Sequence, residues 1–223
     1  MKKVTTTSSR KSDHIRINLE EDVQSGITTG FERYRLPHRA LPELKLKKVD
    51  TSTRFLDHEL NIPLLISSMT GGTEEAGLIN KNLALAAQKK KIAMGVGSQR
   101  ITIEKPETNA SFNIREFAPD IFLMANIGAV QLNYGYCWKE CQKVVENIGA
   151  DALILHFNPL QEAIQPEGDT DFSDLVSKIE KVVTKVTVPV IAKEVGWGFS
   201  RKDVELLLNC GINAIDVAGA GGT

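Results

Sequence analysis

The sequence has little of what membrane-spanning, secreted or nucleic-acid-binding proteins require. Its longest apolar stretches, such as 62–69 and 152–157, are far shorter than the ~20 residues that cross a bilayer. The 27 Lys and Arg residues nearly balance 28 Asp and Glu residues, so no overall positive field attracts nucleic acid or an anionic membrane. The basic first eleven residues are not followed by an apolar run, which argues against a secretory signal. We therefore expect a cytoplasmic protein that binds neither nucleic acid nor a membrane.

Cysteine is also scarce, with three residues in the chain. Cys137 and Cys141 lie four apart in a predicted helix, and no nearby histidine completes a metal-ligand set. We interpret the three as reduced, structural thiols. What the chain does have is 42% hydrophobic residues, enough for an ordinary globular core.

Short, nearly continuous apolar runs recur every 26 to 36 residues from residue 63 onward. Such runs are typical of strands covered on both faces, as in a parallel sheet. Between them lie segments with helical spacing, for example Leu78, Leu83 and Ala87, and a segment with Ser200 as its N-cap and Gly211 as its stop. The six runs begin at Pro63, Ile92, Ile121, Ala152, Val188 and Ala214.

Serial βα units fit either an open doubly wound sheet or a closed (β/α)8 barrel. Polar and small residues follow every predicted strand, and in a barrel these strand ends meet at one mouth, so we predict an α/β protein with the (β/α)8 TIM-barrel fold. Residues 61–223 would form about six of the eight βα units, and residues 1–60 an N-terminal extension packed on the barrel. Closure needs two more units of about 30 residues each, so we expect the chain to be part of a longer barrel.

Lys193 is the most informative single residue, because it lies in a strand otherwise built of apolar residues. A buried, unpaired ammonium is costly, so Lys193 needs an anionic partner. Glu194 should point to the opposite face of the sheet, which leaves Lys193 facing the mouth and a ligand. A structural ion pair with another strand is the alternative.

Four further features follow strand ends or precede the barrel. The stretch 156–169 brings an imidazole, amides and carboxylates together, a set that suits Mg²⁺ unless these groups are only solvated. Arg100, after a glycine-flanked strand, could bind diphosphate by a forked contact. Two glycines at 71 and 72 would let the backbone approach a ligand closely, although an ordinary βα turn also explains them. The basic run at 10–14 is either a solvated tail or an anion site.

Taken in order, eight stretches resemble the successive motifs of the type 2 isopentenyl-diphosphate delta-isomerases, which are FMN-dependent. They are RKSDHI, LPHRALPEL, SSMTGG, MGVGSQR, ANIGAVQL, HFNPLQEAIQPEGD, VIAKEVGWG and DVAGAGGT. The family pattern in the first stretch is usually RKxEH, so Asp13 departs conservatively from it. Family members also continue for roughly a hundred residues beyond the last motif.

The resemblance implies that isopentenyl diphosphate and dimethylallyl diphosphate interconvert by a 1,3-proton shift. The family uses Mg²⁺ and reduced FMN, with NADPH as the reductant. The resemblance also implies a homo-oligomer. Lys193 would lie beside the N1–C2=O edge of the flavin, Glu162 would bind Mg²⁺, and Gln161 and His156 would be catalytic. The implied cofactor-binding residues are Ser68, Met69, Thr70, Ser98, Asn126, Lys193 and Thr223. The implied substrate-binding residues are Arg10, Lys11, Ser98, Gln99, Arg100, His156, Asn158 and Gln161.

Two other readings stay open at this point. Another FMN-dependent TIM-barrel oxidoreductase would share the fold and a lysine beside the flavin. Alternatively, a chain of this length is a non-catalytic fragment as it stands.

Overall fold

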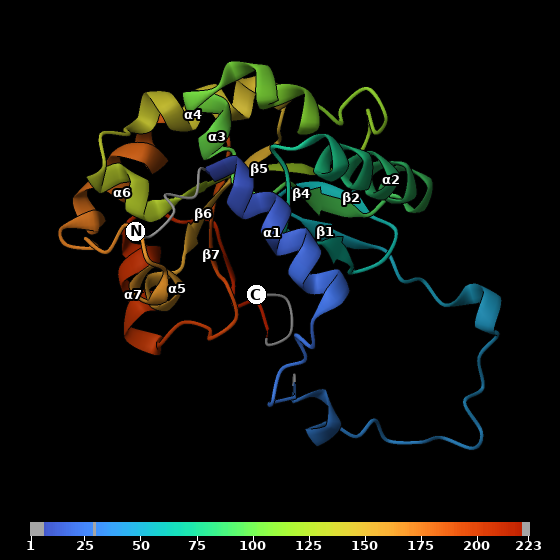
Figure 1. Cartoon of the computed structure of the whole chain (residues 1–223). Coiled ribbons are helices and arrows are strands. Elements are labelled where there is room, and N and C mark those ends of the chain that lie inside the picture. The colour runs from blue at the N-terminus through green and yellow to red at the C-terminus, as the bar shows by residue number, and fades with distance from the viewer. Residues whose placement is uncertain (1–6, 29, 220–223) are drawn as a thin grey trace.

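The structure is a computed structural model that describes residues 7–28 and 30–219. Within them, six parallel strands form one sheet in sequence order, which curls into half of a barrel (Figure 1). All six predicted apolar runs contain a strand, and the barrel prediction is confirmed to this extent. The strands are β3 (Leu65–Ile66), β4 (Ala93–Gly95), β5 (Leu123–Gly128), β6 (Ala152–Phe157), β7 (Val190–Glu194) and β8 (Ala214–Asp216).

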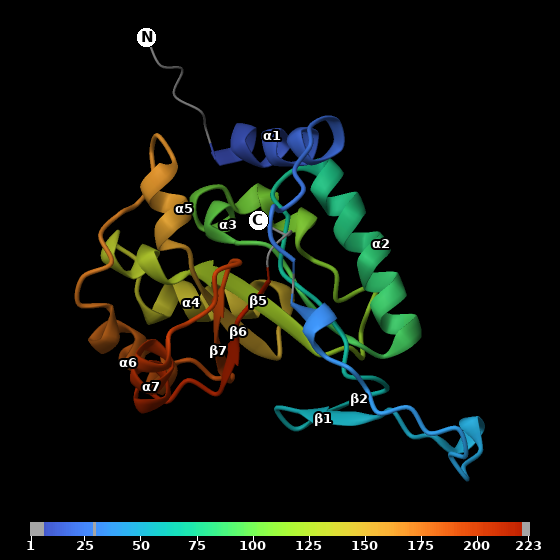
Figure 2. The same ribbon diagram turned by 90° about the horizontal axis from the view of Figure 1, so that it is seen from below.

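The longer helices that connect these strands lie on the convex side of the curled sheet, and the two shortest lie near the carboxyl ends of the strands (Figure 1 and Figure 2). This one-sided arrangement is that of a barrel wall with its outer ring of helices. The α-helices are α2 (Glu74–Lys90), α3 (Arg100–Glu104), α4 (Trp138–Ile148), α5 (Pro159–Ile164), α6 (Leu175–Lys185) and α7 (Arg201–Asn209), and two 3-10 helices, η3 (Pro106–Ser111) and η4 (Ala129–Asn133), complete the connections.

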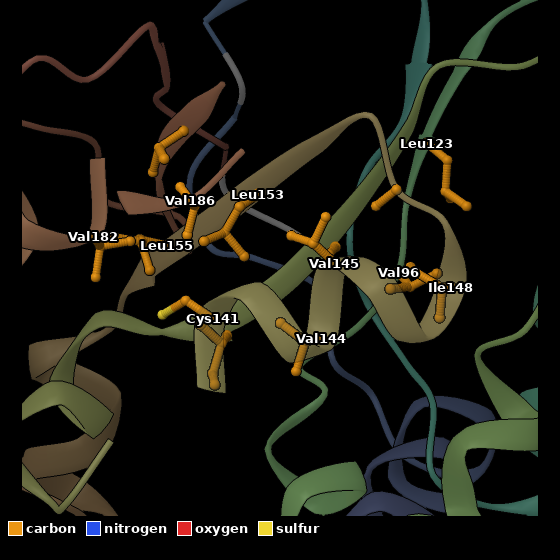
Figure 3. Close-up of a cluster of buried hydrophobic side chains, with 14 of the residues drawn as sticks. Val96, Leu123, Cys141, Val144, Val145, Ile148, Leu153, Leu155, Val182 and Val186 are labelled. Carbon is orange, nitrogen blue, oxygen red and sulfur yellow. The ribbon is translucent and has the colours of Figure 1, made fainter. Parts of the chain in front are cut away.

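Both faces of the sheet are apolar, which explains why the strands have no polar alternation in sequence. The outer core packs sheet residues such as Leu153 and Leu155 against helices, and Figure 3 shows Cys141, Val145 and Ile148 of α4 lying against them. The inner core lies on the concave face and consists of Leu60, Ala93, Phe122, Met124, Ala152, Ile154 and Ile191.

A short hairpin closes the amino ends of the strands. β1 (Thr53–Phe55) pairs antiparallel with β2 (His58–Leu60) through a turn in which Leu56 and Asp57 both have positive φ. Leu60 is buried in the inner core, and the Phe55 ring meets Phe122 edge-on at 5.6 Å. The carboxyl ends of the strands are consequently the open side of the half-barrel, which we call the mouth.

Helix α1 (Thr7–Glu20) lies across the mouth, on the side opposite the hairpin (Figure 2). The segments that follow it, 21–28 and 30–50, are exposed almost throughout and contain η1 (Phe31–Arg33) and η2 (Leu46–Lys48). The side chains of Arg10 and Lys11, and Thr223 as a whole, lie outside the described residues.

Local signals in the sequence predicted two of these helices. Ser200 caps α7, with its hydroxyl accepting the Asp203 N–H and Asp203 in return accepting the Ser200 N–H, and Gly211 follows the helix with φ +88°. The helical spacing of Leu78, Leu83 and Ala87 predicted a helix that α2 confirms. Small residues let α2 approach the sheet closely: its buried face consists of Ala76, Asn80, Ala84 and Ala87, while Leu78 is exposed.

Candidate active site at the barrel mouth

A row of polar side chains crosses the concave face of the sheet at the mouth. His156 pairs in register with Lys193, and Lys193 pairs with Asp216. Each of these positions is two residues beyond an inner-core position, for example Ile154 before His156 and Ile191 before Lys193. Since side chains two apart in a strand share a face, the row continues the inner core toward the mouth.

His156 is held in place by the neighbouring strand. Its Nδ1 lies 2.8 Å from Oδ1 of the buried Asn126. A Cβ at Gly128, the register partner of His156, would lie 3.2 Å from His156 Nε2. The glycine therefore leaves room for the imidazole, and Asn126 fixes the plane of the ring.

Lys193 is 5% exposed, and its Nζ donates to the Glu194 main-chain oxygen at 2.7 Å. Burial lowers the pKa of Lys193, while the negative charges of Asp216 and Glu194 partly offset that effect. Because the attraction between opposite charges is stronger away from water, a buried cation on the concave face stabilises a bound anionic ligand more than an exposed one would.

The loop after β3 lies directly against β4. Ser68 is buried, and its Oγ has no hydrogen-bond partner within the described residues. A Cβ at Gly95 would lie 2.3 Å from this oxygen, and one at Gly97 would lie 2.5 Å from the Thr70 carbonyl oxygen. The glycines thus permit the close packing that places Ser68, Met69 and Thr70 at the mouth, where Met69 is 63% exposed.

The stretch 98–100 divides between the mouth and the protein interior. Ser98 is partly buried at the end of β4, as expected for a mouth residue. Gln99 is fully buried, with its Nε2 donating to the Val144 oxygen and its Oε1 accepting the Asn126 N–H, both at 3.1 Å. The structure therefore places the Gln99 amide behind the mouth, where it ties β5 and α4 to the end of β4.

Arg100 connects two loops of the mouth. Its guanidinium binds Glu104 at 2.9 Å and also pairs with Asp169, whose Oδ2 accepts from Gln131 as well, at 3.2 Å. Burial alone would lower the pKa of Arg100, but the two carboxylates outweigh it and the pKa is raised overall. Gln131 lies in the 3-10 helix η4 and belongs to the motif ANIGAVQL, but it was not among the predicted site residues.

The loop after β6 is folded back on itself by Asn158 and Glu162. Asn158, 4% exposed, donates its Nδ2 to Gln161 Oε1 at 3.2 Å and to Glu162 Oε1 at 2.8 Å. Glu162 Oε2 accepts the Asp169 N–H at 2.8 Å. A Cβ at Gly168 would lie 1.8 Å from the Glu162 carbonyl oxygen, so this fold requires glycine there.

No group of three or more His, Cys, Asp or Glu side chains suited to a metal occurs in the part of the chain that the structure describes. Glu162 therefore belongs to no cluster of three such side chains among these residues. One carboxylate can be enough to bind Mg²⁺ where water and substrate phosphate oxygens complete the coordination shell. No helix among the described residues is long and apolar enough to cross a membrane.

Solved structures identify the class of protein that this fold defines. A mutant of an active chimera of (S)-mandelate dehydrogenase aligns with TM-score 0.59 and 13% identity, over 86% of this chain and 61% of that one. A mandelate oxidase mutant with a monooxide FMN adduct aligns with TM-score 0.57 and 12% identity, over 91% and 65%. At such identities the likeness shows the fold alone, a (β/α) barrel with its ligand face at the strand carboxyl ends.

The sequence relatives are more specific, although no protein-family model matches the chain. An isopentenyl-diphosphate delta-isomerase from Nostoc sp. is 59% identical over 218 residues, 97% of this chain and 62% of that protein. Those from Synechococcus sp. and Rickettsia bellii are 57% and 54% identical, over 62% and 63% of their lengths. The chain is a homologue of the isopentenyl-diphosphate delta-isomerases, as its motifs predicted, and it spans about 62% of the length of these relatives.

Proposed function

We propose that this chain supplies the catalytic mouth of an isopentenyl-diphosphate delta-isomerase, which interconverts isopentenyl and dimethylallyl diphosphate by a 1,3-proton shift. The observation that carries the proposal is the 59% identity to a curated isomerase, which spans all the strand ends described above. An FMN-dependent oxidoreductase, the competing reading, is supported by fold neighbours at 12–15% identity, which show the fold alone.

The residues at the mouth fit FMN in three respects. Ser68 offers a buried hydroxyl without a hydrogen-bond partner among the described residues, Gly95 and Gly97 allow close backbone approach, and Lys193 offers a buried cation. Reduced FMN, when bound, supplies an electron-rich ring that stabilises positive charge developing on the substrate, and NADPH would keep it reduced. We propose as its binding residues Ser68, Met69, Thr70, Ser98, Asn126, Lys193 and Thr223.

For the substrate, we propose that Gln161 and His156 handle protons, with Asn126 and Asn158 orienting their side chains. Glu162 would bind Mg²⁺ together with the diphosphate oxygens. Arg10, Lys11, Ser98, Arg100, His156, Asn158 and Gln161 would contact the diphosphate and the allyl region. Gln99 was predicted to join them, but its burial assigns it to positioning the end of β4 instead.

Three wider features belong to the same proposal. Residues 1–60 would form an extension packed on the barrel formed by 61–223, and the protein would be a cytoplasmic homo-oligomer. Its remaining barrel units would come from sequence corresponding to the other part of the relatives.

Proton NMR in deuterated water tests the activity directly. The full-length protein, loaded with FMN, reduced with dithionite and supplied with Mg²⁺, should convert isopentenyl diphosphate and incorporate deuterium into the product. Protein with oxidised FMN is the matched control and should show far less conversion. The absence of deuterium incorporation in the reduced, flavin-loaded protein would refute the proposal.

A further inference from the structure

The Glu194 carboxylate is bound to the backbone of the loop that follows its own strand, β7. Its side chain is 6% exposed, and a single carboxylate oxygen, Oε2, accepts three main-chain N–H groups from the loop after β7. The donors are Gly196 at 2.6 Å, Trp197 at 2.5 Å and Gly198 at 3.1 Å. Hydrogen bonds to a charged acceptor are the strong ones, so this carboxylate fixes the loop backbone.

The loop backbone at 196–198 has few side-chain contacts that could fix it. Gly198 has φ +77°, a conformation that L side chains rarely adopt, and the indole of Trp197 is 70% exposed. Phe199, which follows, packs against the outer core, and its ring meets that of Phe157 edge-on at 5.6 Å beside an apolar cavity of about 580 Å³. The end of the loop is therefore held by Phe199, and its 196–198 backbone by the Glu194 carboxylate.

The same residue also orients Lys193. The Lys193 ammonium donates to the Glu194 carbonyl oxygen, so the residue that anchors the loop also carries the acceptor for the buried cation. If the carboxylate contacts are lost, the 196–198 backbone loses three hydrogen bonds, and the Glu194 peptide that carries this acceptor is held less firmly. Asp216, which pairs with Lys193 in register, would then be the nearest negative charge.

We propose that Glu194 is a positioning residue for the flavin side of the mouth: by binding the 196–198 backbone it keeps the Lys193 ammonium aimed at the cofactor. The inference rests on the proposed function, in which Lys193 contacts FMN. It assigns Glu194 no contact with either cofactor or substrate.

The first measurement concerns the loop itself and needs no activity. In full-length Glu194→Gln protein, amide hydrogen exchange of the peptide covering 195–199 should accelerate by at least about tenfold, because three charge-assisted hydrogen bonds are weakened. The exposed Glu116, changed to Gln, is the matched control and should leave this peptide unchanged. Unchanged exchange in Glu194→Gln overturns the inference.

The second measurement separates this inference from the proposed function. In FMN-loaded protein, the absorbance of the reduced flavin is titrated with pH for wild type, Lys193→Met and Glu194→Gln. Lys193→Met should raise the pH at which the reduced flavin ionises, because the anion loses its cation, and Glu194→Gln should shift it part of the way in the same direction.

If Lys193→Met leaves the titration unchanged, the placement of Lys193 beside the flavin fails, and with it the proposed cofactor site. If Lys193→Met shifts it and Glu194→Gln does not, only the role of Glu194 fails. Gly198→Ala strains the loop without altering the carboxylate, and it should reproduce the Glu194→Gln shift; a wild-type titration in that variant would also contradict the inference.

Discussion

Asn158 illustrates how single side chains shape this site. One nearly buried amide nitrogen binds both Gln161 and Glu162, so the proposed proton-handling group and the proposed metal ligand share a single support. Its Oδ1 has no hydrogen-bond partner among the described residues, and it therefore offers an acceptor at the mouth. One buried side chain thus holds two proposed functional residues and leaves one acceptor for a ligand.

Replacing Gln161 with Ala should lower kcat by about 10²-fold, the contribution typical of a positioned proton-handling group. FMN affinity should stay within a factor of about two, because the proposed function places Gln161 on the substrate side of the mouth. Steady-state kinetics and flavin fluorescence titration measure the two quantities. Ile164→Ala, an exposed change in the same helix, is the control, and a wild-type kcat for Gln161→Ala would remove its catalytic role.

Glu162→Gln should raise the Mg²⁺ concentration needed for half-maximal activity, because an amide is a poorer ligand for a hard cation than a carboxylate. Metal titration at saturating substrate measures it. The exposed Glu167, changed to Gln in the same loop, should leave the midpoint unchanged. If the two variants respond in the opposite way, the metal belongs to Glu167.

The cysteines offer a test of burial through pH. Burial raises the pKa of Cys141 to about 12, so its reactive thiolate is scarce at any pH below that value, whereas Cys137 is exposed. Between pH 7 and pH 9, iodoacetamide should modify Cys137 in the folded protein and leave Cys141 unmodified. Peptide mass spectrometry reads this out, with unfolded protein as the control in which all three cysteines react. Equal labelling of Cys141 and Cys137 in the folded protein would show that α4 is not packed as described.

At the scale of elements, side-chain contacts join the connections after β4, β5 and β6 to one another. The Asp169 carboxylate pairs with Arg100, which follows β4, and accepts a hydrogen bond from Gln131, which follows β5. The Asp169 N–H donates to Glu162, which follows β6. Three consecutive βα connections therefore hold one rim of the mouth together. A substitution in one loop should therefore alter the conformation of the other two.

Gly168→Ala tests this coupling. The new methyl group would meet the Glu162 carbonyl at 1.8 Å, and neither backbone can yield easily, so we expect a loss of about 1–3 kcal/mol in the free energy of unfolding. Because Glu162 moves, the Mg²⁺ requirement should rise as well. Urea unfolding and metal titration measure the two effects, and Gly26→Ala, which adds a methyl group in open space, is the control. Unaltered stability would mean that the 162–168 contact is not formed.

At the scale of the whole molecule, the half-barrel exposes strand edges. β3 and β8 each have one hydrogen-bonded neighbour within the described sheet. Strand edges of this kind favour association with other chains. In barrels of this class the cofactor phosphate commonly binds at the loops after strands seven and eight, beyond the six strands described in this sheet.

A polypeptide of residues 1–223 alone should therefore bind FMN weakly, show no isomerase activity and associate as its concentration rises. Fluorescence titration of FMN and analytical ultracentrifugation, each beside a full-length protein, measure these properties. Micromolar or tighter FMN binding by the short polypeptide would show that the six βα units suffice for the cofactor.

The order and type of the elements could be predicted from the sequence because their signals are local. Continuous apolar runs marked all six strands, and the Ser200 cap marked α7. Helical spacing likewise marked α2, but which of its residues are buried depends on what lies opposite the helix, and there the buried face consists mainly of small residues that pack close to the sheet. The motifs likewise indicated the similarity to isopentenyl-diphosphate delta-isomerases, since 59% identity is a property of the sequence itself.

Only the tertiary structure decided which polar residues face the mouth and which support it. Gln99 and Ser98 are adjacent in the chain, yet one is buried against α4 and the other lies at the mouth. Glu194 binds its own loop, and Asp169 joins three connections, through contacts that span up to 69 positions in the chain. The physical reason is that a hydrogen bond depends on distance and direction in space, which the curling of the sheet determines and the order of residues along one strand does not.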